Sequence, residues 1–164
     1  MRNLLLIWAI THDSLGAARL ALRLGADPNA SRPAHVEGWI FAHGVGPTAG
    51  LLVAVQRRNA PMVRLLVEAG ADANVRSDEA GSALYVAAEL HDLALAKLLV
   101  EHGADVRSKE GILKGSPLHA AVRQGGGLEL ARQLLAWGAD PNASDEGETP
   151  LHAAAYWGDV EAMK

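Results

Sequence analysis

The triplet Gly-Ala-Asp occurs four times along the chain, and each copy follows a leucine-rich stretch with the spacing of a helix. The copies begin at Gly25, Gly70, Gly103 and Gly138, so that successive copies are 45, 33 and 35 residues apart. A recurrence at about 20 to 50 residues is typical of proteins built from stacked units, each too small to bury its apolar face alone. The chain is therefore expected to fold as a row of similar units packed against one another.

A leucine upstream of each triplet gives a second marker, at Leu6, Leu51, Leu84, Leu118 and Leu151. From this leucine to the glycine of the triplet the distance is 19, 19, 19 and 20 residues, whereas from the glycine to the next leucine it is 26, 14, 15 and 13. The helical part of the unit is therefore constant and the loop varies, because surface loops accept insertions at small entropic cost. We predict a single domain, 1–164, with a loop insertion at 31–46. The repeats are expected at about 3–30, 47–75, 81–108, 115–143 and 148–164, the last one incomplete.

Polar residues mark where the first helix of a repeat begins. Thr149 can accept a hydrogen bond from an unpaired N–H of the first turn, and Pro150 lacks the N–H that would otherwise stay unpaired. Ser116 and Pro117 repeat this pair. Small residues follow at 153–155 and let the first helices of neighbouring repeats approach closely. Each repeat should therefore begin with a short, tightly packed helix.

The second helix of a repeat should carry the apolar stripe that packs between repeats, as Val63, Leu66 and Val67 do at helical spacing. The glycine of each triplet then ends this helix in a left-handed conformation, which costs glycine nothing sterically. An asparagine comes four residues after three of these glycines, and its side-chain amide is expected to bond the local backbone of the turn. These asparagines are Asn29, Asn74 and Asn142.

Several of these segments together resemble ankyrin repeats. They are TPLHAAAYWGD from Thr149 to Asp159, SPLHAAVRQGG from Ser116 to Gly126, and GADPNA at Gly25 and Gly138. The resemblance covers nearly the whole chain, and the family period of about 33 residues agrees with the spacing of the two central triplets. It implies an all-α solenoid in which each repeat has a hairpin-like loop followed by two antiparallel helices. It also implies that His119 and His152 bond around the helix start and the adjacent loop.

Three repeats depart from the family pattern. The first lacks the Thr-Pro-Leu-His start and is identified mainly by the distance from Leu6 to Gly25. The second has Ala-Gly-Leu-Leu at 49–52, with Arg58 where a glycine usually turns the chain between the two helices, and the third keeps only the cap, at Ser82. The sequence stops inside the second helix of the fifth repeat, which predicts either further repeats in a longer array or ends that self-associate.

Composition and charge narrow the classes of partner. With 49% apolar and 21% charged residues the chain should fold, since this composition is far from that of disordered proteins. A formal net charge of -4 has the wrong sign for a phosphate-binding surface, so no nucleic-acid partner is expected. No apolar run approaches the roughly 18 residues of a membrane-spanning helix, so no membrane partner is expected either. The lack of cysteine suits a cytoplasmic location, although the run from Leu4 to Ile10 has a short signal peptide as its alternative interpretation.

The seven histidines invite a metal or catalytic interpretation, which their pattern does not favour. His119 and His152 occupy the same position in successive repeats, and such positions lie too far apart to share a zinc ion. The other histidines lack an HExxH or similar ligand spacing, and no serine lies in a nucleophile motif. We therefore expect no catalytic residue, no cofactor and no metal, and hence no enzyme. The alternative is a regulatory or substrate-recruiting portion of a larger enzyme or effector protein.

The family resemblance implies that the chain binds another protein. In ankyrin-repeat proteins the hairpin tips and the ends of the first helices line a concave face, and aromatic and arginine side chains dominate the energetics of protein interfaces. The candidate protein-binding residues at the helix ends are Arg57, Glu89, Leu90, Arg123, Gln124, Tyr156 and Trp157. For Tyr156 and Trp157 the alternative is that they cover the end of the stack.

The insertion at 31–46 contributes two further candidates, Trp39 and Phe41. An extended finger with aromatic residues can enter a groove of a partner, whereas the same residues can also fold back over the irregular second repeat. Both interpretations are open at this point.

Overall fold

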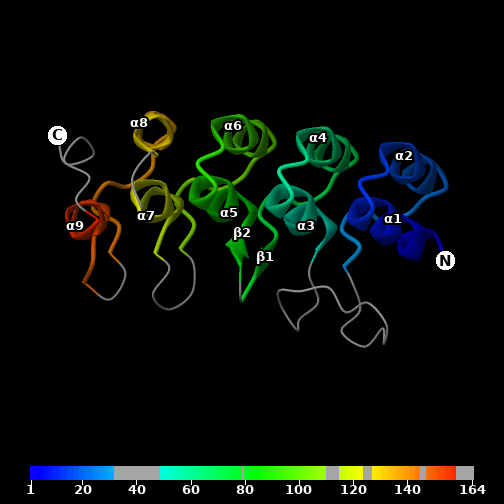
Figure 1. Cartoon of the computed structure of the whole chain (residues 1–164), viewed down its shortest axis with the longest axis horizontal. Coiled ribbons are helices and arrows are strands. Elements are labelled where there is room, and N and C mark those ends of the chain that lie inside the picture. Colours follow the sequence, from blue (N-terminus) through cyan, green and yellow to red (C-terminus); the bar gives the residue numbers. More distant parts are fainter. Residues whose placement is uncertain (32–48, 79, 110–114, 124–126, 145–146, 158–164) are drawn as a thin grey trace.

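Helices stand in two rows along the long axis of the chain (Figure 1). This computed structural model describes residues 1–31, 49–78, 80–109, 115–123, 127–144 and 147–157. One row holds the first helix of each repeat: α1 (Arg2–Thr11), α3 (Gly50–Gln56), α5 (Ala83–Glu89), α7 (Pro117–Val122) and α9 (Pro150–Tyr156). The other row holds the second helices: α2 (Leu15–Arg23), α4 (Ala60–Glu68), α6 (Leu93–Glu101) and α8 (Leu128–Ala136). The predicted all-α fold of helix pairs is confirmed.

The described ends of the loops leave the row of first helices on the side away from the second helices (Figure 1). In the third repeat the loop is a short antiparallel hairpin of β1 (Arg76–Ser77) and β2 (Gly81–Ser82). In the second repeat a single bridge joins Ser31 to Ala49 at the base of the long loop. Apart from Ser31, the predicted insertion lies outside the described residues, and Trp39 and Phe41 lie there too.

The core is one continuous layer that runs through all the repeats. From α1 to α7, each first helix contacts the second helix of its own repeat and the first helix of the next. Alanines such as Ala87 and Ala120 are buried between first helices, where a larger side chain would push the repeats apart. The marker leucines are buried from Leu6 to Leu118, but Leu151 on α9 is 56% exposed.

Two kinds of residue adopt a left-handed backbone at the ends of helices. The predicted conformation of the triplet glycines is confirmed, with φ between 82° and 95° at Gly25, Gly70, Gly103 and Gly138. Between the first and second helices the same conformation falls on Asp13, Arg58 and His91, with φ of 53°, 53° and 52°. A side chain is disfavoured in this region, so these three positions need compensating contacts.

Hydrogen bonds join the turn of each repeat to the turn of the next, and we call this series the turn ladder. Asn74 shows the pattern: its Oδ1 accepts from Asp105 N–H at 2.7 Å, and its Nδ2 donates to Gly103 O at 2.9 Å. Asn29 bonds Asp72 N–H at 2.7 Å in the same way. The prediction that these asparagines bond their local backbone is therefore wrong. That role belongs to the aspartates of the triplets, each accepting the N–H two residues on at 2.9 Å.

Gly127, which precedes α8, is buried where a side chain has no room. A Cβ atom there would overlap the carbonyl oxygen of Ala121 and lie 3.0 Å from His91 Cδ2. We expect Gly127→Ala to lower the free energy of unfolding by about 2 kcal/mol, because a backbone atom cannot move aside easily. Urea denaturation followed by circular dichroism measures the change.

Gly16 in α2 is the matched control, since nothing lies within 4 Å of a Cβ atom built on it. Gly16→Ala should raise the free energy of unfolding by about 0.5–1 kcal/mol, because alanine is the better helix former. Equal effects of the two substitutions would contradict the packing assigned to Gly127.

Candidate interaction surface

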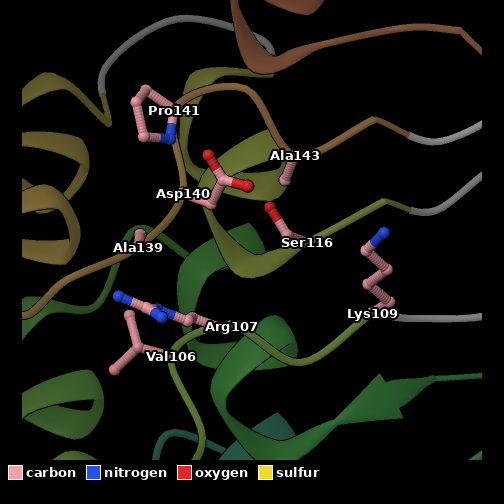
Figure 2. A pocket seen from close by; sticks show the side chains of 8 residues that line it. All are labelled: Val106, Arg107, Lys109, Ser116, Ala139, Asp140, Pro141 and Ala143. Atoms are coloured by element: carbon pink, nitrogen blue, oxygen red, sulfur yellow. The ribbon is translucent and has the colours of Figure 1, made fainter.

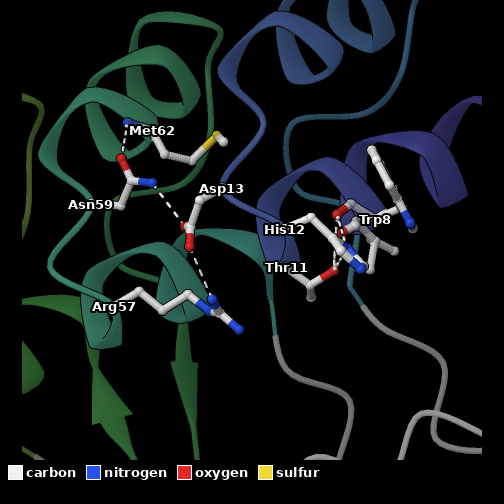
Figure 3. Close-up of polar contacts among 8 residues, drawn as sticks. Trp8, Thr11, His12, Asp13, Arg57, Asn59 and Met62 are labelled. Carbon is white, nitrogen blue, oxygen red and sulfur yellow. Dashed lines mark hydrogen bonds and ion pairs between the residues drawn. The ribbon is translucent and has the colours of Figure 1, made fainter.

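The carboxyl ends of the first helices carry polar side chains that connect neighbouring repeats (Figure 3). Arg57 Nη1 lies 3.1 Å from Asp13 Oδ2, and Asn59 Nδ2 donates to Asp13 Oδ1 at 2.9 Å. Asn59 Oδ1 in turn accepts from Met62 N–H at 3.0 Å and so caps α4. Because Asp13 and Arg57 are both about half exposed, we assign this ion pair only about 0–1 kcal/mol. Its main effect is to hold Arg57 in one position.

Two more arginines make contacts from one repeat to the next. Arg58 Nη2 donates to Leu90 O at 2.8 Å, which satisfies a carbonyl at the end of α5. Arg123 Nη1 donates to the hydroxyl of Tyr85 at 3.2 Å. Beside them Glu89 is exposed, and Leu90 is half-buried against the core. The arginines predicted to meet a partner are thus also part of the contacts between repeats.

An aromatic pair lies at the amino-terminal end of this row. The rings of Trp8 and His12 stack at 4.5 Å with 19° between their planes, and Trp8 is 42% exposed. His12 Nδ1 lies 2.9 Å from Trp8 O, and since a carbonyl only accepts, this nitrogen carries the proton. Sequence reasoning did not select Trp8 as a binding residue. Its position four residues before His12, on the same face of a helix, was the available signal.

A second aromatic pair lies at the carboxyl-terminal end. The rings of Tyr156 and Trp157 meet edge to face at 5.5 Å, and these side chains are 84% and 49% exposed. Tyr156 is the last residue of α9 and Trp157 is its C-cap, so both lie apart from the arginines on the earlier repeats. Gln124 lies outside the described residues. The structure therefore brings Arg57 to Asp13 and Arg123 to Tyr85, while the two aromatic pairs mark opposite ends of the row.

The two repeat histidines bond the start of their own helix. His119 is 2% exposed, and its Nδ1 accepts from Ser116 N–H at 3.0 Å. The proton therefore sits on Nε2, which lies 3.2 Å from Glu148 O in the next repeat and donates to it. His152 Nδ1 accepts from Thr149 N–H at 3.2 Å. Within the described segments, no three His, Cys, Asp or Glu side chains form a group that could hold a metal ion.

Paired helices stacked in two rows, with side-chain caps on the last three first helices and an exposed row of side chains, define a helical repeat protein. Comparison with known families matches residues 51–145 and 112–164 to ankyrin repeats, described as three copies. The chain belongs to the ankyrin-repeat family, whose members generally bind other proteins and are typically not catalytic. The matched ranges leave out α1 and α2, which pack on the stack as the later helix pairs do. No helix in the described part of the chain is long and apolar enough to cross a membrane.

His119 and His152 offer a comparison of one motif in a buried and an exposed setting. We expect His119→Ala to lower the free energy of unfolding by about 2–3 kcal/mol, because it leaves buried backbone groups without partners. His152→Ala should cost less than about 1 kcal/mol, since water can replace the lost bonds at an exposed site. Urea denaturation of both variants tests this, and a larger loss for His152→Ala would be incompatible with the contact to Glu148.

Proposed function

We propose that the chain binds a folded protein or peptide through the surface made by the ends of the first helices and the adjacent loop tips. The observation that carries this proposal is the pair of exposed aromatic clusters at the two ends of the row, Trp8 with His12 and Tyr156 with Trp157. Large aromatic side chains dominate the energetics of protein interfaces, because they bury much surface at small cost in conformational entropy. Both clusters support a recognition surface.

The polar residues between the clusters support the same proposal. Arg57 is held by Asp13 before any partner arrives, and a guanidinium retains further N–H groups after one bond is made. A side chain already held in place loses less conformational entropy on binding. Glu89, which is exposed, supplies the opposite charge in the next repeat. We propose Arg57, Glu89 and Arg123 as polar contacts and the aromatic residues as the main contributors to affinity.

The uncovered face of α9 supports a further contact. Leu151 is exposed there, whereas the equivalent Leu118 is covered by α9. A second copy stacked end to end would meet α1, where Asn3 Oδ1 already accepts from Asp27 N–H and Arg2 Nη1 already donates to Leu24 O. These two bonds satisfy Asp27 N–H and Leu24 O, while the guanidinium of Arg2 and the side-chain amide of Asn3 keep further N–H groups. We propose that a further ankyrin-type repeat or a second copy of this chain covers α9.

The candidates in the insertion, Trp39 and Phe41, stay a prediction, as does the cytoplasmic location. If these residues fold back over the second repeat, replacing both with alanine lowers the melting temperature. If they form a finger that enters a partner, the melting temperature is unchanged and binding is lost.

Removing the carboxyl-terminal aromatic pair tests the proposed function. A Tyr156→Ala, Trp157→Ala double variant should bind a partner captured by the wild-type chain at least about tenfold more weakly, as loss of an interface hot spot predicts. Affinity capture from a lysate, followed by calorimetry with the captured protein, gives the two dissociation constants. Thermal melts of each protein establish that the variant is folded.

A Leu20→Ala, Leu24→Ala double variant is the matched control, because it removes two exposed apolar side chains from the row of second helices. It should bind like the wild-type chain. If the aromatic variant binds the partner as tightly as this control, Tyr156 and Trp157 are not part of the interface.

A further inference from the structure

The turn ladder is irregular at one step, between the third and fourth repeats. Arg107 occupies the place that Asn29 and Asn74 hold in the preceding repeats. Its Nε donates to Gly138 O at 2.8 Å, so it replaces the donor half of the asparagine amide. A guanidinium has no acceptor, however, and cannot replace the oxygen half.

Because Arg107 provides no acceptor, the backbone N–H of Asp140 lacks the oxygen that an asparagine would provide. The equivalent N–H groups of Asp27, Asp72 and Asp105 each donate to an asparagine Oδ1, at 3.0, 2.7 and 2.7 Å. No residue in the described part of the chain accepts a hydrogen bond from Asp140 N–H. The structure thus has one backbone donor that lacks the acceptor provided at every other step.

A hollow of about 350 Å³ opens at this step. Figure 2 shows Arg107 and Lys109 on opposite sides of Ser116, with Asp140 next to Ser116. Neither Arg107 nor Lys109 forms an ion pair with any described residue. The only acid in the lining is Asp140, whose Oδ1 already accepts from Asn142 N–H at 2.9 Å. Two cationic residues and one anionic residue therefore line this space.

We propose that the hollow binds a carboxylate, the side chain of a glutamate or aspartate on another protein. One carboxylate oxygen accepts from Asp140 N–H, in the place that the asparagine Oδ1 takes in the other repeats. Arg107, whose Nη groups are left after its bond to Gly138 O, supplies the opposite charge, since hydrogen bonds between charged groups are stronger than neutral ones, and Lys109 lines the same hollow. A phosphate dianion fits less well, because the nearby carboxylate of Asp140 repels its second charge. The site is separate from the aromatic clusters and does not depend on their role.

The amide resonance of Asp140 reports on this site directly. In a ¹⁵N-labelled sample at constant ionic strength, N-acetylglutamate amide should shift this resonance in a saturable way. The glutamine analogue, which is neutral and has nearly the same shape, should leave it unchanged. Inorganic phosphate is the third probe, and a larger saturable shift with phosphate than with the glutamate derivative would overturn the assignment to a carboxylate. No saturable shift with the glutamate derivative would overturn the site itself.

Arg107→Asn removes the site without damaging the fold. The asparagine restores the regular ladder, so its Oδ1 occupies Asp140 N–H and its Nδ2 bonds Gly138 O. We expect this variant to melt a few degrees higher than the wild-type chain, and its affinity for N-acetylglutamate amide to fall about tenfold through loss of a charge-assisted contact.

Arg64→Gln is the matched control, because Arg64 is an exposed arginine on α4, away from the hollow. It removes the same charge and should bind the glutamate derivative like the wild-type chain. If both variants bind the glutamate derivative equally weakly, the loss is a general charge effect. If both bind it like the wild-type chain, Arg107 does not contribute. Either result would overturn the proposal.

Discussion

The close packing of successive first helices is the contact on which the rest of the structure depends. A single helix pair cannot bury the leucine that begins its first helix, so Leu51 and Leu84 are buried only because the next repeat lies against them. Alanines such as Ala87 and Ala120 set the spacing by allowing the helices to approach. Stability is therefore shared between neighbours, and each repeat is folded in part by the next one.

Polar contacts, like the apolar ones, join successive repeats. The turn ladder joins the repeats on one side, and the contacts of Asp13, Arg58 and Arg123 join them at the ends of the first helices. Asp13 and Arg58 stand where glycine would adopt the left-handed conformation without strain. The strain of a side chain there is roughly 1–2 kcal/mol, and the contact that each residue makes with the next repeat offsets part of it. At these turns, local backbone strain is therefore offset in part by contacts between repeats.

The period could be predicted because the same triplet recurs along the chain, and the helix pairs and left-handed glycines could be predicted because each depends on a pattern within one repeat. The partner of Asn74 could not, since its side chain bonds a turn 29 to 31 residues away and no local pattern names that turn. For the same reason, the contacts of Arg57 and Arg123 could not be predicted. The sequence places them at helix ends, but the contacts with Asp13 and Tyr85 depend on how the repeats stack. Trp8 was missed because the first repeat lacks the motif that would have aligned it with the others.

In the proposed interface, residues that join repeats and residues proposed to recognise a partner occupy the same kind of position. The ends of the first helices are exposed, yet Asp13, Arg57 and Arg58 there already have partners in the stack. Changing such a residue to suit a new partner also removes a contact between repeats. Glu89 and Tyr156 are exposed, and neither side chain forms a hydrogen bond or an ion pair with a described residue. Exposed positions without such contacts, as at Glu89 and Tyr156, can change with little cost to stability. Specificity for the proposed partner is therefore best sought there, while the arginines that contact the stack lose less conformational entropy on binding.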